Sequence, residues 1–275
     1  MSGFLDSMAQ SSALRVAAAS SHESLASLRA RAAGAPAAPP LRLQEEGFDV
    51  IAEIKLRSPA AGQLGSPSDD WLGRAAVYAR GGAAAVSVLT EPSRFDGSLQ
   101  HLETAAAALR PLGVPVMRKD FLVDPYQVAE ARAAGAGGVL LIVRMLSPPR
   151  TKQLLDAAAE HGLFVLLEAF DGADLETAAA LLRGRPPHDP CVLIGINCRD
   201  LQTLQVVPQR FETLSPLLPA GWPGVAESGV ACADDARHMQ RLGYRLALIG
   251  TALMTCDDPA ALLGEIFAAT RTVKI

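Results

Sequence analysis

Eight short apolar segments recur along the chain, and each is followed by a longer stretch rich in Ala, Leu and Arg. The longer stretches have the periodicity of amphipathic helices, so the pattern is typical of repeated strand-helix units. The apolar segments begin 22 to 35 residues apart, which is the size of one strand plus one helix. Eight such units predict an α/β fold, a (β/α)8 TIM barrel. The predicted strands are 50–55, 85–89, 116–119, 138–142, 164–168, 192–197, 224–228 and 246–249.

An open doubly wound sheet also alternates strands with helices, and it is the alternative fold. The dinucleotide-binding pattern Gly-x-Gly-x-x-Gly does not follow the first predicted strand. The number of units and the clustering of polar residues at strand ends favour the closed barrel. Helix starts agree with this spacing, since Asp124-Pro125, Ser147-Pro148 and Asp258-Pro259 each place a capping residue before a first-turn proline.

The first part of the chain does not follow this alternation of strands and helices. Apolar residues such as Leu5 and Leu14, followed by a Ser-, Ala- and Arg-rich stretch, predict one or two amphipathic helices before residue 34. The proline-rich segment 34–40 separates them from the first strand. We therefore expect an N-terminal helical extension at 1–47 and a barrel catalytic domain at 48–275. The extension could serve as a lid, a plug for one barrel end or an interaction arm.

Charge and composition exclude several classes of partner. The net charge of −4 and the pI of about 5.8 give no general attraction to nucleic acid or to an anionic membrane. No apolar run is long enough to span a bilayer and no secretory signal is recognisable, so we expect a cytoplasmic protein with a small-molecule partner. The four cysteines show no metal-binding spacing, which predicts reduced thiols and no metal site. They are Cys191, Cys198, Cys232 and Cys256.

Polar side chains lie at the carboxyl ends of the predicted strands, where the catalytic groups of TIM barrels are found. Two of them stand inside one apolar strand: Glu53 and Lys55 alternate with Ile51, so all three share a face. A structural ion pair would also explain this pair. Accidental polar residues, however, would scatter over both ends of the strands. The candidate catalytic residues are Glu53, Lys55, Lys119, Glu168, Asn197 and Ser228.

A phosphate site is predicted beside them. Gly250 and Thr251 follow the eighth strand and open a short apolar segment, while Ser228 and Gly229 follow the seventh. TIM barrels commonly bind phosphate between these two loops, at the amino end of a short extra helix. Ser58, in the loop after the first strand, is placed to close over such a ligand.

The sequence resembles the indole-3-glycerol-phosphate synthase family from about residue 48 to the end, in the family's order. The most specific match is Lys119-Asp120-Phe121 followed by Asp124-Pro125-Tyr126-Gln127. Other matching blocks are 51–55 with Ser58-Pro59, 87–90 with Phe95 and Gly97-Ser98, 130–132 with Gly135-Ala136, 195–197 with Arg199-Asp200-Leu201, Glu227-Ser228-Gly229 and 250–254.

The resemblance implies a ring closure without a metal or organic cofactor. The family converts 1-(2-carboxyphenylamino)-1-deoxyribulose 5-phosphate into indole-3-glycerol phosphate, a step of tryptophan biosynthesis that releases carbon dioxide and water. By resemblance, Lys119 is the general acid and Glu168 the general base. Lys55 holds the substrate carboxylate or assists one protonation, and Glu53, Asn197 and Ser228 orient the other groups. We expect the pKa of Lys119 to be lowered by a neighbouring cation and by desolvation.

The resemblance also implies a binding site around these groups. Phe95 and Phe121 line an apolar slot for the anthranilate ring, and Arg199 steadies the first loop or the substrate. The remaining substrate- and phosphate-binding residues are Ser58, Glu227, Gly229, Gly250 and Thr251. Three positions depart from the usual family pattern, namely Ala61, Phe170 and Cys198, and they leave open a relative that acts on a modified anthranilate.

Two rival functions remain. Phosphoribosylanthranilate isomerase, a barrel of the same phosphate-binding group, uses a Cys base at the end of its first strand, whereas this strand offers Glu53 and Lys55. A non-catalytic scaffolding barrel is expected to lose part of the polar rim, and here the rim is intact. The resemblance also leaves room for association with other tryptophan-pathway enzymes.

Overall fold

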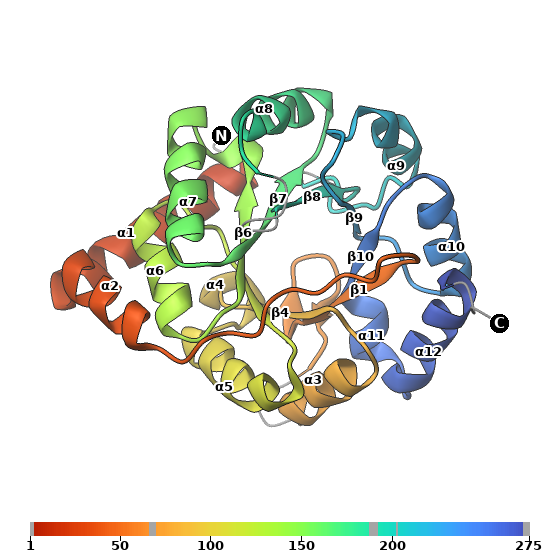
Figure 1. Ribbon diagram of the computed structural model, residues 1–275, viewed down its shortest axis with the longest axis horizontal. Helices are drawn as coiled ribbons and strands as arrows, with labels where there is room; N and C mark the ends of the chain where they lie inside the picture. The colour runs from red at the N-terminus through yellow and green to blue at the C-terminus, as the bar shows by residue number, and fades with distance from the viewer. Residues whose placement is uncertain (1–2, 66–69, 187–191, 202, 272–275) are drawn as a thin grey trace.

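Eight parallel strands close into a barrel in the computed structural model, which describes residues 3–65, 70–186, 192–201 and 203–271 (Figure 1). Around the barrel the strands follow the order β1-β10-β9-β8-β7-β6-β5-β4, and β4 pairs with β1 to complete the ring. The predicted (β/α)8 TIM barrel is therefore confirmed. Its strands are β1 (Asp49–Ile54), β4 (Ala85–Leu89), β5 (Val116–Lys119), β6 (Gly138–Ile142), β7 (Phe164–Ala169), β8 (Val192–Asn197), β9 (Gly224–Glu227) and β10 (Leu246–Ile249).

Five of the eight predicted strands have the observed bounds, β7 and β9 differ by one residue at the carboxyl end, and β1 is shifted by one residue at both ends. The difference matters at β1, which ends at Ile54 and leaves Lys55 just beyond the strand. It matters also at β9, which ends at Glu227 because Ser228 adopts a left-handed backbone conformation with φ 67°. A strand cannot continue through that conformation.

Helices surround the barrel on its outside (Figure 1). Three begin at the predicted prolines, and the Asp124 and Asp258 side chains accept hydrogen bonds from the backbone N–H groups of Tyr126 and Ala261. Their inner faces and the outer faces of the strands form one large apolar core, and a second apolar cluster fills the barrel interior. These helices are α3 (Trp71–Arg80), α5 (Leu99–Leu109), α6 (Pro125–Ala133), α7 (Pro148–Glu160), α8 (Gly172–Leu182), α9 (Gln209–Leu214), α10 (Ala233–Arg241) and α12 (Pro259–Thr270).

Smaller elements stand at the carboxyl ends of the strands. The short strands β2 (Arg57–Ser58) and β3 (Gly62–Gln63) form an antiparallel hairpin directly after β1. Helix α4 (Pro92–Phe95) follows β4, and α11 (Thr251–Thr255) follows β10. Helix α11 is the short extra helix that the sequence predicts after the eighth strand.

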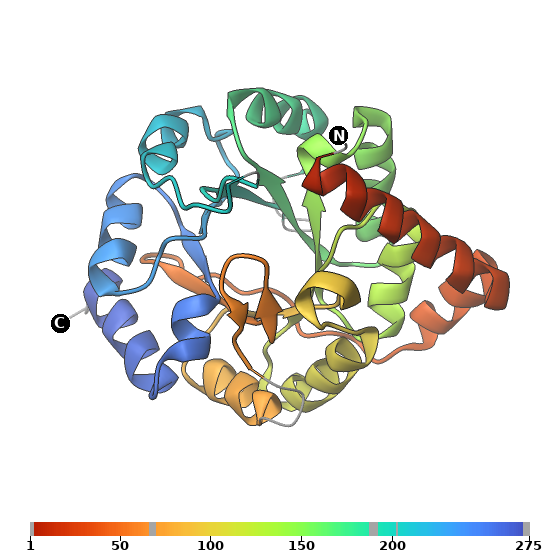
Figure 2. The ribbon, with the colours of Figure 1, turned by 180° about the vertical axis from the view of Figure 1, so that it is seen from behind.

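The N-terminal extension contributes two helices, α1 (Phe4–His22) and α2 (Leu25–Gly34). Helix α2 packs on α6, where Leu28 is buried against Tyr126 and Ala129. Helix α1 lies on the side of the barrel where the strands end (Figure 2). The segment that follows α2 crosses the opposite end, and Leu41 and Leu43 pack there against the apolar cluster of the barrel interior (Figure 1).

Within the described ranges, no helix combines the length and the apolar character that a membrane crossing requires. Cys198, Cys232 and Cys256 are free thiols, while Cys191 lies outside the described residues.

Candidate active site

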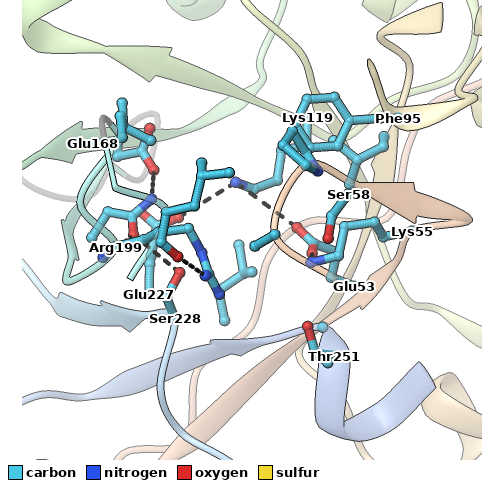
Figure 3. A pocket seen from close by; sticks show the side chains of 18 of the residues that line it. Glu53, Lys55, Ser58, Phe95, Lys119, Glu168, Arg199, Glu227, Ser228 and Thr251 are labelled. Carbon is cyan, nitrogen blue, oxygen red and sulfur yellow. Dashed lines mark hydrogen bonds and ion pairs between the residues drawn. The ribbon is translucent and has the colours of Figure 1, made fainter. Parts of the chain in front are cut away.

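The polar residues at the strand ends surround one pocket of about 460 Å³ (Figure 3). Its walls come from strands on all sides of the barrel and from the loops that follow them. Every residue that the sequence nominates lines this pocket: Glu53, Lys55, Ser58, Phe95, Lys119, Phe121, Glu168, Asn197, Arg199, Glu227, Ser228, Gly229, Gly250 and Thr251.

Glu53 and Lys55 form an ion pair at the carboxyl end of β1. Side chains alternate along the strand, so Ile51 and Glu53 point into the barrel, and Lys55 follows on the same side. Lys55 Nζ donates to Glu53 Oε1 at 2.7 Å, and Lys119 Nζ lies 3.8 Å from Glu53 Oε2. Burial alone would raise the pKa of Glu53, but the two ammonium groups outweigh it and lower the pKa. Glu53 is therefore an anionic link between two cations.

Lys119 is surrounded by carboxylates, and this overturns the expectation for its pKa. Desolvation does favour the neutral amine, as expected. The charges of Glu168, Glu53 and Glu227 are larger in total and raise the pKa of Lys119 above its ordinary value. The expectation counted a neighbouring cation, Lys55, whose charge is already neutralised by Glu53 at 2.7 Å. Lys119 is thus a persistent cation at the centre of the site.

Glu227 stands on the other side of Lys119, with Oε2 3.7 Å from Lys119 Nζ. Only 1% of its surface is exposed, and among the described residues neither carboxyl oxygen has a hydrogen-bond partner. Burial and the charge of Glu168 raise the pKa of Glu227 well above its ordinary value, and Lys119 only partly offsets them. Burial and the Glu168 charge thus favour the protonated form of the Glu227 carboxyl group.

Glu168 is held by a chain of hydrogen bonds that starts in the neighbouring strand. Asn197 Nδ2 donates to Glu168 Oε1 at 2.6 Å. The amide oxygen of Asn197 accepts from Ser228 Oγ at 3.0 Å and from the Arg199 backbone N–H at 2.9 Å. Because both acceptor positions of that oxygen are used, the amide can only turn its NH₂ group toward Glu168. The left-handed conformation of Ser228 thus serves to aim its hydroxyl at Asn197.

The predicted phosphate loops lie next to this acidic centre. Thr251 is the first residue of α11, and Gly250 stands where a side chain would clash with Glu53 Oε1. Gly229 has φ +88°, a conformation that L side chains rarely adopt. The far end of α11 is anchored, because Tyr78 Oη and Arg74 Nη1 donate to the Leu253 carbonyl at 2.9 and 2.8 Å.

Aromatic rings form the opposite wall. The Phe95 and Phe121 ring centroids lie 6.1 Å apart, and Phe4 of α1 meets Phe121 edge-on at 5.8 Å. Leu5 of the same helix also lines the pocket. The slot is therefore closed on one side by the N-terminal extension.

A buried polar network behind this wall ties α1 to the strand that carries Lys119. Both oxygens of Asp120 accept from Arg15, at 2.7 and 2.8 Å, and one of them also accepts from Thr90 Oγ1 and Arg118. Ser12 Oγ donates to the Phe121 carbonyl at 2.5 Å. Helix α1 is thus attached to the two residues that directly follow Lys119.

Comparisons with known proteins agree with this geometry. A family model described as indole-3-glycerol phosphate synthase matches residues 5–266. The chain belongs to the indole-3-glycerol phosphate synthase family. The enzyme of that name from Nocardioides sp. is 43% identical over 93% of this chain and 94% of its own length. The one from Mycobacterium tuberculosis strain CDC 1551 is 39% identical over 96% and 94%.

Solved structures show the same architecture at lower identity. The 3-hexulose-6-phosphate synthase of Salmonella typhimurium superposes with a TM-score of 0.59 at 14% identity, covering 81% of this chain and 98% of its own. The thiamine phosphate pyrophosphorylase of Pyrococcus furiosus gives a TM-score of 0.58 at 14% identity, covering 81% and 95%. Indole-3-glycerol phosphate synthases are carboxy-lyases that act on a phosphorylated small molecule, so the family membership gives this chain its enzyme class.

Among the pocket-lining residues that the sequence did not indicate are Phe4, Leu5 and Asp120. Asp120 stood within the most specific family block, beside Lys119, and that position was the available signal. The three residues that depart from the family pattern, Ala61, Phe170 and Cys198, lie in different parts of the structure. Phe170 is buried in the pocket wall with the Arg144 guanidinium 4.7 Å from its ring centroid, while the Cys198 thiol donates to the Ser228 carbonyl at 2.9 Å. Ala61 lies in the exposed hairpin turn.

Proposed function

We propose that this pocket closes the indole ring of 1-(2-carboxyphenylamino)-1-deoxyribulose 5-phosphate and releases carbon dioxide and water. The observation that carries the proposal is the placement of Lys119 among three acidic side chains, with phosphate loops on one side and an aromatic slot on the other. Family membership supports it independently.

Lys119 is the proton donor for the attack on the carbonyl. The aromatic carbon attacks the ribulose carbonyl carbon, and negative charge develops on the carbonyl oxygen. Three carboxyl groups keep Lys119 protonated until that oxygen becomes strongly basic, at which point the proton transfers. A charged ammonium also stabilises the developing oxyanion before transfer.

Lys55 holds the substrate carboxylate near the reacting carbon. Its ammonium group is already anchored to Glu53 at 2.7 Å, which fixes its position before substrate arrives. Carbon dioxide leaves when that carboxylate is taken out of water, and the apolar wall of Phe95, Phe121 and Phe4 provides the dry surroundings. Helix α1 therefore acts as a fixed wall of the slot.

Glu168 is the base that removes the last proton from the ring system. The hydrogen bond from Asn197 fixes one of its oxygens and leaves the other free to accept that proton. Ser228 and Arg199 act through Asn197 and are positioning residues in this role. Thr251, Gly250, Gly229 and Ser58 surround the phosphate.

The experiment is a fluorescence assay for indole formation with purified protein and the synthetic substrate. The expected result is stoichiometric conversion to indole-3-glycerol phosphate. The substrate analogue in which the carbonyl is reduced to an alcohol should bind competitively and give no product, because it offers no carbon for attack. Binding of the substrate without any product would contradict the proposed function.

A further inference from the structure

The reaction proposed above requires two protons at one oxygen, and the further inference rests on that proposed function. The carbonyl oxygen takes one proton when the ring closes and a second when it leaves as water. Over the whole reaction only one proton is lost, from the ring carbon next to the nitrogen, as the ring double bond forms. One lysine supplies the first proton, so the leaving step needs either a reloaded lysine or another acid.

The structure offers a second acid at the end of β9. Glu227 lies between the two groups already assigned, with Oε2 3.7 Å from Lys119 Nζ on one side and Glu168 as the strongest neighbouring charge on the other. It lines the pocket, is almost completely buried and has no hydrogen-bond partner among the described residues. A buried carboxyl group whose oxygens accept no hydrogen bond is costly, and a role with the substrate explains it.

The neighbouring strand makes room for this side chain. Gly195 on β8 faces Glu227, and a Cβ at that position would clash with Glu227 Oε1. A larger residue would displace the carboxyl group from the centre of the pocket. The position of Glu227 is therefore set by two strands and is independent of the loops.

The surroundings also favour the protonated form of this carboxyl group. Burial and the Glu168 charge raise its pKa, Glu53 adds to the effect, and Lys119 opposes it. In that form the carboxyl group can donate a proton, whereas the raised pKa of Lys119 makes its ammonium group a weaker acid than an ordinary lysine.

We propose that Glu227 is a second catalytic acid, which protonates the oxygen that leaves as water while Glu168 removes the proton from the adjacent carbon. The carbon–oxygen bond breaks and the oxygen takes the Glu227 proton. The carbon–hydrogen bond breaks, its proton goes to Glu168, and its electron pair forms the ring double bond. The proton on Glu168 then returns to Glu227, which restores both groups, and Lys119 regains from water the proton that it gave in the ring closure.

The arrangement suits this elimination because the two reacting atoms sit on neighbouring carbons. The acid and the base must therefore reach the same part of the substrate, and Glu227 and Glu168 line the same pocket and interact strongly through their charges. Lys119 lies between Glu53 and Glu227 and is placed for the earlier, ring-closing protonation. Each acid thus serves one step.

The test separates carbon dioxide release from indole formation in single turnovers of Glu227→Gln, which keeps the shape of the side chain but has no transferable proton. We expect indole formation to fall about 100-fold or more, because general acids contribute roughly 10²–10⁴-fold. The rate of carbon dioxide release should stay within about 5-fold of the native rate, a change much smaller than the loss of a general acid would cause. Rapid quenching and mass spectrometry should detect an enzyme-bound adduct heavier than the product by one water.

Parallel loss of both products, or indole formation close to the native rate, would overturn the proposal. Glu265→Gln, the same change on the exposed face of α12, is the control. Glu227→Asp keeps an acid one methylene shorter and should recover part of the indole rate; if it accumulates no adduct and slows both products equally, the proposal is also wrong. Native enzyme that makes no indole would refute the proposed function instead.

Discussion

Replacing Arg15 by Met should destabilise the protein far more than the loss of a surface ion pair. Arg15 makes a two-pronged ion pair with Asp120, which lies 105 residues away in the sequence and whose side chain is fully buried. Met preserves most of the apolar stem of Arg15 but removes both charge-assisted hydrogen bonds. The variant therefore isolates the bond between α1 and the residue after Lys119.

The magnitude follows from what remains around Asp120. Breaking a fully buried pair costs about 3–5 kcal/mol, and a hydrogen bond to a charged group contributes about 1.5–3 kcal/mol. Arg15 is 27% exposed, and Asp120 keeps its bonds from Thr90 Oγ1, Arg118 and the Phe121 N–H. We therefore expect the free energy of unfolding to fall by about 2–3 kcal/mol, less than for a fully buried pair and more than for an exposed one.

The effect should depend on pH in a defined direction. Burial would raise the pKa of Asp120, but the hydrogen bonds from Arg15 and the charge of Arg118 outweigh it and hold the pKa far below the ordinary 3.8. A lowered pKa stabilises the folded state above the pKa of the unfolded chain, and this contribution is lost as the pH falls. The difference between native and variant should thus be full at pH 7 and shrink below about pH 4.

Urea unfolding followed by circular dichroism measures this difference. The control is Arg29→Met on α2, which removes an exposed pair with Glu160 at 3.4 Å and should cost no more than about 0.5 kcal/mol. A change in Arg15→Met as small as in that control would refute the reasoning, because the buried network would then contribute nothing to attaching α1.

Two further predictions concern the ends of the pocket. Thr251→Glu places a carboxylate at the amino end of α11. It should raise KM at least tenfold by repelling the substrate phosphate, with kcat less affected. An unchanged KM in steady-state assays would show that this loop does not bind the phosphate. Phe4→Ala removes the ring that meets Phe121 edge-on and should raise KM several-fold while the fold survives, as half-buried Phe4 lies at the start of α1. Identical KM values for Phe4→Ala and native enzyme would show that α1 does not bound the occupied slot.

The barrel fold and the strand-end residues that line its pocket could be predicted, because both depend on local sequence patterns. Buried parallel strands are continuous apolar runs, and their carboxyl ends meet at one face, so the residues at those ends converge. Glu53 and Lys55 were placed correctly by strand alternation alone. The glycines and prolines at strand and helix ends fixed most boundaries to within one residue.

Contacts between distant segments had no such local signal. Nothing in the amphipathic pattern of α1 indicated that Phe4 and Leu5 would line the pocket or that Arg15 would bind Asp120. The pKa of Lys119 was expected to shift in the wrong direction, because its sign depends on distances across the barrel. Lys55 is a nearby cation in the sequence, but in the structure Glu53 neutralises it and carboxyl groups dominate.

The role of Lys119 as general acid is tested most directly by the turnover of Lys119→Ala beside that of Lys152→Ala, a change at an exposed lysine on α7. Lys119→Ala should still bind the substrate, through Lys55 and the phosphate loops, but form indole at least about 100-fold more slowly, as expected for loss of a general acid. Lys152→Ala should match the native enzyme. Near-native indole formation by Lys119→Ala would show that the ammonium group at the centre of the three carboxyl groups is not the acid of the reaction.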